Sequence, residues 1–200
     1  MRWLATGLMV AALLGGCDSN PPQIAAHSHH FGFEKVVSFD VLRSGGRIHL
    51  LVAGLGMGQT SLAYTWSADG GRHWAAAVPV GAAAPSPYGL GRGNDVQIAA
   101  AGKQLVAVWP TAGQGWGGTG PLASAWSQDA GQHWQPGPPP APGFAGGEGY
   151  AAIKADAKGR FHLVWLDSRN GKQALYSAQS DDGGRTWGDP VAIDAASCEC

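Results

Sequence analysis

The sequence is poor in cysteine and in charge, and it has no excess of either sign. It contains 3 Cys among 200 residues, and charged residues make up 14% of it, against about 25% in an average soluble protein. The net charge is −1, with no basic stripe and no acidic tail. Nucleic acid is therefore not expected as a partner. No stretch after the first 20 residues shows helical periodicity, so long amphipathic helices are not expected either.

Glycine, proline and tryptophan are abundant instead. The chain has 32 Gly, 13 Pro and 9 Trp. So many turn-forming residues predict many short strands separated by turns. Nine Trp in a chain of this size indicate packing positions that recur, rather than one aromatic pocket.

The first residues have the features of a bacterial targeting segment. Arg2 gives a positive start, and the apolar run from Trp3 to Leu14 is too short to span a bilayer. Leu14-Gly15-Gly16-Cys17 resembles a lipobox, which predicts a signal peptide over 1–16, lipidation of Cys17 and a flexible tether over 17–31. The expected location is the bacterial cell envelope, on its periplasmic or extracellular face, with the membrane as a partner through the lipid. An ordinary signal peptide with a chance Cys is the alternative.

An internal repeat predicts the fold. An eight-residue box, S-x-D-x-G-x-[HT]-W, occurs three times with steps of 60 and 53 residues. Its recurring residues are Ser67, Asp69, Gly71 and Trp74, then Ser127, Asp129, Gly131 and Trp134, then Ser180, Asp182, Gly184 and Trp187. A second mark, a glycine that starts an apolar run, precedes the boxes at Gly46, Gly102 and Gly159. Each unit then predicts four antiparallel strands, over about 33–81, 92–136 and 148–197.

The box resembles the Asp box, or BNR repeat, of the sialidase superfamily. The third unit matches best. It has Asp156, Gly159 and Arg160 before its box, Trp165 in its second strand, and Asp167 and Arg169 in the short loop that follows. The resemblance implies an all-β, sialidase-like β-propeller made of three four-stranded antiparallel blades. Since sialidase propellers have six blades, 32–200 would be a partial propeller with two open flanks. We expect either the first half of a longer gene product, which we favour because the chain stops at Cys200, or a dimer that closes the ring.

The physics of the box predicts a structural role. Its Asp can accept bonds from its own turn, its Gly supplies a positive φ, and its Trp buries an apolar face. Binding groups are expected at the opposite end of each blade, where long Gly- and Pro-rich loops collect. The binding candidates there are Tyr88, Arg92, Asn94, Trp116, Asp167 and Arg169, with Tyr88 and Trp116 suited to stacking on a sugar.

Three residues are candidates for catalysis: Asp95, Glu148 and Tyr150. Strand alternation places Glu148 and Tyr150 on one face, although Glu148 as a solvated loop acid is the plainer alternative. For Asp167 and Arg169 the plainer alternative is a surface ion pair or a loop brace.

A sialidase, as the resemblance implies, needs three arginines, a Tyr–Glu pair and an acid–base Asp. Five of the seven arginines after the signal segment fall at the box end, which leaves Arg92 and Arg169. We therefore expect a lipoprotein that binds a glycan or a protein without catalysis. The alternatives are an exo-α-sialidase completed by further sequence and a propeller that serves as an assembly scaffold.

No cofactor is expected. His27, His29 and His30 could bind a metal ion, but a polar tether explains them better. Cys198 and Cys200 could chelate a soft metal, yet no third ligand stands nearby in the sequence.

Overall fold

Alternating apolar residues and regularly placed turns fold each unit of the repeat into one sheet. The computed structural model describes residues 31–143 and 147–195. Its strands are β1 (Lys35–Ser44), β2 (Arg47–Gly56), β3 (Gln59–Ser67), β4 (Val78–Val80), β5 (Gln97–Ala101), β6 (Gln104–Ala112), β7 (Thr119–Ser127), β8 (Gln135–Gly137), β9 (Gly149–Ala155), β10 (Phe161–Asp167), β11 (Ala174–Ser180) and β12 (Val191–Asp194). The only helical element among the described residues is one 3₁₀ turn, η1 (Trp116–Gly118).

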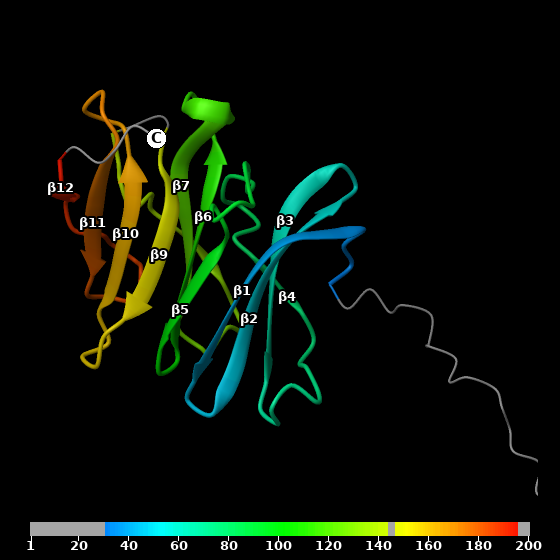
Figure 1. The fold of residues 1–200 in the computed structure, drawn as a ribbon. Coiled ribbons are helices and arrows are strands. Elements are labelled where there is room, and N and C mark those ends of the chain that lie inside the picture. The colour runs from blue at the N-terminus through cyan, green and yellow to red at the C-terminus, as the bar shows by residue number, and fades with distance from the viewer. Residues whose placement is uncertain (1–30, 144–146, 196–200) are drawn as a thin grey trace, which may run out of the picture.

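The strands form three sheets, each a simple meander. Their orders are β1-β2-β3-β4, β5-β6-β7-β8 and β9-β10-β11-β12, and every neighbouring pair is antiparallel. We call these sheets blade 1, blade 2 and blade 3. The three sheets stand side by side in chain order, with blade 2 between blade 1 and blade 3 (Figure 1). The predicted all-β fold of three four-stranded antiparallel blades is confirmed.

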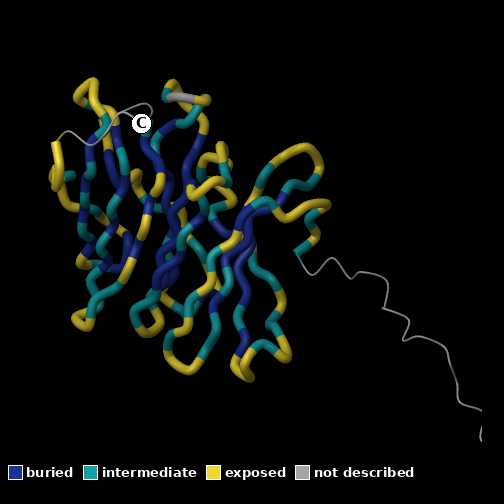
Figure 2. The backbone as a smooth tube through the Cα atoms, in the orientation of Figure 1, coloured by how far each residue is buried: buried dark blue, intermediate teal, exposed yellow. Residues whose placement is uncertain are grey.

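The hydrophobic core lies between the blades rather than within any one of them. Between blades 1 and 2 it includes Leu51, Tyr64, Ile98 and Trp109, and between blades 2 and 3 it includes Val106, Ile153, Phe161, Leu163 and Trp165. Buried backbone therefore runs through the middle strands, whereas the turns at both ends are exposed (Figure 2). Because each sheet has two packing faces, blade 2 is the one blade with both faces covered by other described residues.

The two ends of the blades differ in their turns. One end, which we call the box end, carries the three boxes and the tight turns that follow the first strands. The other, which we call the ligand end, carries the long connections, including η1 and the link from blade 2 to blade 3. Among the described residues, no helix is long and apolar enough to cross a membrane.

Candidate functional site

The three boxes share one hydrogen-bonding pattern. In the second box, the Ser127 hydroxyl donates to Asp129 at 2.8 Å and accepts from the Gly131 N–H at 2.9 Å. Asp129 also accepts from the His133 N–H at 3.0 Å. The first box repeats these contacts with Ser67 and Asp69, and in the third Asp182 accepts from Thr186. The carboxylates are thus occupied by their own turns.

These internal bonds also set the acidity of the box carboxyls. The pKa of Asp69 lies below its usual range, first because the His73 N–H donates to it, and then because of the His73 ring and the Ser67 hydroxyl. A carboxylate held ionised by its own turn is a poor proton donor near neutral pH. The boxes therefore have the chemistry of structural turns.

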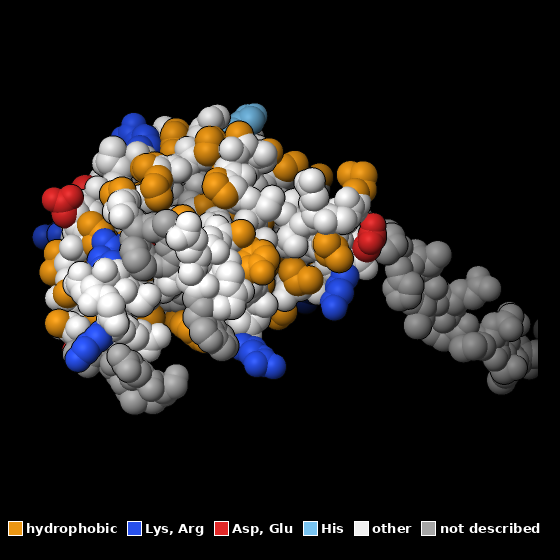
Figure 3. Space-filling view, turned by 90° about the horizontal axis from the view of Figure 1, so that it is seen from above, with side chains coloured by type: hydrophobic (Ala, Val, Ile, Leu, Met, Phe, Trp, Pro, Cys, Tyr) orange, Lys and Arg blue, Asp and Glu red, His pale blue; other side chains and the backbone are white. Residues whose placement is uncertain are grey.

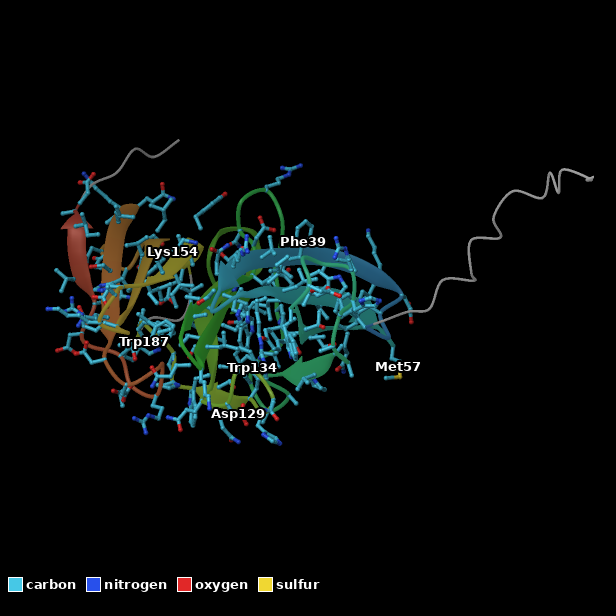
Figure 4. The ribbon with its side chains drawn as sticks, turned by 90° about the horizontal axis from the view of Figure 1, so that it is seen from below. Phe39, Met57, Asp129, Trp134, Lys154 and Trp187 are labelled. Atoms are coloured by element: carbon cyan, nitrogen blue, oxygen red, sulfur yellow. The ribbon has the colours of Figure 1, made fainter. Side chains whose placement is uncertain are left out.

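The box glycines have a second task that the sequence does not reveal. Gly131 and Gly184 have φ of 85° and 87°. These positive φ values are one reason for glycine at both positions, and the lack of space for a side chain is another. A Cβ on Gly131 would stand 2.0 Å from the ring of Tyr64 in blade 1, and one on Gly184 would stand 2.8 Å from Val106 in blade 2. The second and third box turns therefore pack directly on the preceding blade (Figure 4 shows Asp129, Trp134 and Trp187 at this end).

At the ligand end a pocket of about 420 Å³ opens between blades 2 and 3. Four of the predicted residues line it: Arg92, Asn94, Glu148 and Tyr150. Leu90, Thr119, Leu166, Ser168 and Gln173 complete much of its wall, together with several glycines. Figure 3 looks down onto this end, where the visible charged side chains lie mostly toward the edge.

Arg92 projects into this region from a two-residue turn. Gly91 and Asn94 exchange both backbone hydrogen bonds, at 3.2 and 3.1 Å, and Arg92 and Gly93 between them have φ of 55° and 88°. Two positive φ values in succession define a type I′ turn, which is strained for an arginine. The Arg92 side chain is exposed at the pocket rim.

Tyr150 lines the same pocket from blade 3, and its backbone is strained in the same way. Its φ is 52° and its side chain is 53% exposed. The Tyr150 N–H donates to the Asn94 carboxamide at 3.0 Å, and Asn94 donates to Gly89 O at 3.1 Å. A Cβ on Gly93 would stand 3.5 Å from the Tyr150 ring. The Arg92 turn and the Tyr150 strand are thus fixed against each other, although they belong to different blades.

Glu148 does not have the environment that the sequence suggested. It is 0% exposed, so the view of it as a solvated loop acid is wrong. Its carboxylate accepts from the Leu122 N–H of blade 2 at 2.7 Å and lies 3.5 Å from an Arg169 nitrogen. Burial raises its pKa to about 7, the Leu122 N–H and Arg169 oppose that shift, and Asp167 adds to it. Its hydrogen bonds go to Leu122 and Arg169 rather than to Tyr150.

Asp167 and Arg169 form a brace beneath the pocket rather than a surface ion pair. Asp167 ends β10 and is 1% exposed. It accepts from the Arg169 backbone N–H and from its Nε, each at 2.7 Å, and from the Trp165 indole at 3.1 Å. The guanidinium carbon also lies 4.9 Å from the centre of the Tyr176 ring. Arg169 is therefore held below the pocket surface, and Arg92 is the arginine that lines it.

Asp95 and Tyr88 are not among the described residues that line this pocket. Asp95 accepts from the Ser38 hydroxyl at 2.9 Å and so joins blade 2 to blade 1. Tyr88 is 45% exposed on the same end, and Trp116 begins η1. His27, His29, His30, Cys17, Cys198 and Cys200 fall outside the described residues. Within 31–143 and 147–195, no group of three or more His, Cys, Asp or Glu could hold a metal ion.

Comparison with known proteins agrees with this architecture. Three solved structures illustrate the likeness. A protein of unknown function from Dyadobacter fermentans is 19% identical with a TM-score of 0.52, over 80% of this chain and 56% of that one. A polysaccharide lyase, an ulvan lyase, is 11% identical with a TM-score of 0.56, over 80% and 39%. The NanB sialidase of Streptococcus pneumoniae is 20% identical with a TM-score of 0.45, over 68% and 19%.

The first two structures share the fold. This chain spans little more than half of the first structure's chain and less of the other two. No curated protein matches the chain. The model of a protein family described as "BNR repeat-like domain" matches residues 21–198. The chain therefore belongs to the BNR repeat-like family, with the sialidase-like β-propeller fold that its boxes and blades display.

Proposed function

We propose that this chain is the glycan-binding propeller part of a bacterial envelope lipoprotein, and that as a 200-residue chain it binds without catalysis. The observation that carries the proposal is the pocket between blades 2 and 3, which Arg92 and Tyr150 both line from strained backbone positions. Strained backbone at two residues that line one pocket, both with side chains able to contact a ligand, is typical of a binding site. A sugar face can stack on the Tyr150 ring while Arg92 donates to its oxygens.

The geometry of the arginines supports the proposal that the chain binds without sialidase activity. A sialidase needs several arginines converging on the sugar carboxylate, and among the described residues Arg169 is engaged with Asp167 while Arg92 lines the pocket. Each charge-assisted contact contributes roughly 1.5–3 kcal/mol, so one missing arginine costs tenfold or more in transition-state binding. A purified sample should not release the fluorophore from a fluorogenic α-sialoside. Turnover that disappears in Tyr150→Phe would establish a sialidase instead.

One observation favours that enzymatic alternative. Glu148 is buried beside the pocket with its pKa raised to about 7, and a carboxyl poised near neutral pH is suited to proton transfer. If the alternative holds, the rate of sialoside turnover should change with pH, with an apparent pKa near that of Glu148. Glu148→Gln should remove this pH dependence.

Glycan binding is tested with two arginine variants, one at the pocket and one at the box end. Arg92→Ala removes the cation at the pocket rim, and Arg72→Ala removes an exposed arginine from the first box turn. Purified proteins are applied to an array of acidic and neutral oligosaccharides, and a glycan that binds is then titrated. Loss of about tenfold or more in affinity for Arg92→Ala alone supports the site. Equal binding by both variants would place the site elsewhere, and binding only to a protein partner would contradict glycan recognition.

The membrane anchor is tested separately, because Cys17 lies outside the described residues. Its support is the short apolar run that ends in Leu14-Gly15-Gly16-Cys17. Cys17→Ser should release the protein from the membrane fraction or block signal processing. Unchanged fractionation and unchanged gel mobility would remove the lipoprotein proposal and leave the glycan site untouched.

A further inference from the structure

A second, smaller pocket opens at the ligand end, between blades 1 and 2. We call the pocket between blades 2 and 3 pocket A and this one pocket B. Pocket B has a volume of about 210 Å³, against about 420 Å³ for pocket A. Its volume is below the usual range for a complete ligand site. Pocket B therefore has room for part of a ligand, as a subsite would.

The lining of pocket B is neutral and partly polar. Among the described residues that line it, none is charged. Its polar groups include the hydroxyls of Ser61, at the start of β3, and of Ser86, and both residues are exposed. Trp109 of β6 is 1% exposed, and its indole donates to Pro85 O at 2.9 Å, which fixes this wall on blade 2. Since a hydroxyl both donates and accepts, this lining matches the hydroxyl groups of an uncharged sugar unit.

One segment of chain lines both pockets. The link between blades 1 and 2 lines pocket B up to Pro87 and pocket A from Gly89 onward. Tyr88 is the single residue between the two linings. The Cα atoms of Pro87 and Gly89 are no more than about 7 Å apart, because two residues of extended chain reach no farther. The two pockets are therefore neighbours, with Tyr88 between them.

Tyr88 is fixed through its backbone, and much of its surface is open. Its N–H donates to Pro110 O of β6 at 2.9 Å, and Pro87 before it pairs with Thr111 of the same strand. A Cβ on Gly118 would stand 3.0 Å from the Tyr88 hydroxyl oxygen, so one edge of the ring lies against η1. Tyr88 is nevertheless 45% exposed. An aromatic ring held between two pockets with open area is suited to stacking on a sugar.

We propose that pocket A, Tyr88 and pocket B form one continuous track that binds an oligosaccharide of about three units or more, an inference that rests on the glycan binding proposed above. One unit lies in pocket A beside Arg92, the next stacks on the Tyr88 ring, and a neutral unit contacts Ser61 and Ser86 in pocket B. Because the units are joined, binding of the first raises the effective concentration of the others. The chain then recognises the length of a glycan as well as its end.

The test is the affinity of the full chain for single sugars and for longer sugars that contain them, measured by isothermal titration in mild detergent. The probes are three pairs: sialic acid with sialyllactose, glucuronic acid with a hyaluronan tetrasaccharide, and glucose with maltotriose. The two acidic pairs offer Arg92 a carboxylate, and the third pair does not. In at least one pair, wild type should bind the longer sugar about tenfold or more tightly than the single sugar.

Two substitutions interrupt the track outside pocket A. Tyr88→Ala removes the ring, and Ser86→Leu replaces a hydroxyl of pocket B with a bulkier apolar side chain. Each should weaken binding of the longer sugar by about fivefold or more and leave binding of the single sugar unchanged. Tyr88→Phe keeps the ring, and Ala83→Leu adds an apolar side chain at an exposed residue of the same link that lines neither pocket. Both controls should bind as wild type does.

A wild type that binds no longer sugar more tightly than its single unit would overturn the track. A length preference that survives both Tyr88→Ala and Ser86→Leu would do the same. If single sugars bind and Arg92→Ala weakens them, the proposed function stands although the track is wrong. If no sugar binds in any pair or on the array, the proposed function is wrong as well. Circular dichroism checks folding, and if one variant fails to fold, the other decides beside its own control.

Discussion

The box end and the ligand end of the blades are built on opposite principles. At the box end the same serine, aspartate and glycine contacts recur in all three blades, within about 0.2 Å of one another. At the ligand end the contacts of Arg92, Asn94, Glu148 and Tyr150 occur once. Repetition suits a scaffold because every blade has the same turn to close. A site that must bind one ligand needs side chains that are placed individually, and the unrepeated end provides them.

The largest expected effect tests the blade-to-blade packing at the box end. Gly131→Ala adds a Cβ 2.0 Å from the Tyr64 ring at a φ of 85°. Overpacking and backbone strain each cost about 1–3 kcal/mol, so the free energy of unfolding should fall by about 3–5 kcal/mol. Urea denaturation measures this value.

Gly70→Ala is the matched control for that substitution. Gly70 has a φ of 77° with no atom within 4 Å of its Cβ position, and Ala130 stands in the same place of the second box with a φ of 61°. The control should cost about 1 kcal/mol. Equal losses for the two variants would show that φ alone, and not the approach to Tyr64, requires the glycine.

The next effect contrasts the two ends by their response to pH. The pKa of Glu148 is raised to about 7 by burial, so between about pH 4.5 and 7 the folded state holds a proton that the unfolded state has released. Stability from Glu148 is complete below pH 4.5 and is lost as the pH rises to about 7, by up to about 3 kcal/mol. Box carboxyls such as Asp69 have lowered pKa values, so their stability is lost only below about pH 4.

Glu148→Gln separates these two contributions. In the variant, the free energy of unfolding should no longer fall between pH 5 and 8, but it should still fall in acid. Urea unfolding at a series of pH values measures both. A wild-type stability that is flat from pH 5 to 8 would mean that Glu148 is not buried as described.

A smaller effect compares one serine from each end. Ser127 is buried, and its hydroxyl accepts from the Gly131 N–H. Ser127→Ala leaves that N–H without its partner and should cost about 1–3 kcal/mol. Ser168 is exposed in the pocket wall, so Ser168→Ala should change stability by less than about 0.5 kcal/mol. Thermal melts of both variants check the pair, and a greater loss at Ser168 would reverse the contrast.

The sequence predicted the repeated part of the molecule well and the unrepeated part poorly. The boxes and the glycines Gly46, Gly102 and Gly159 recur at one period, and a period can be read without knowing any contact between blades. Glu148 was misjudged because its partner, the Leu122 N–H, belongs to another blade. Strand alternation also failed at Tyr150, since its φ of 52° departs from extended backbone. No local pattern announces a positive φ at a tyrosine, or the approach of Gly131 to Tyr64.

The most direct test of the division between scaffold and site is the affinity of Arg92→Ala for a glycan that wild type binds, measured by titration beside Arg72→Ala. Both substitutions remove an exposed arginine, so they differ in location and not in charge. The account predicts that Arg92→Ala loses about tenfold or more in affinity with an unchanged melting temperature, while Arg72→Ala binds as wild type does. An unchanged affinity in Arg92→Ala, or an equal loss in both variants, would contradict it.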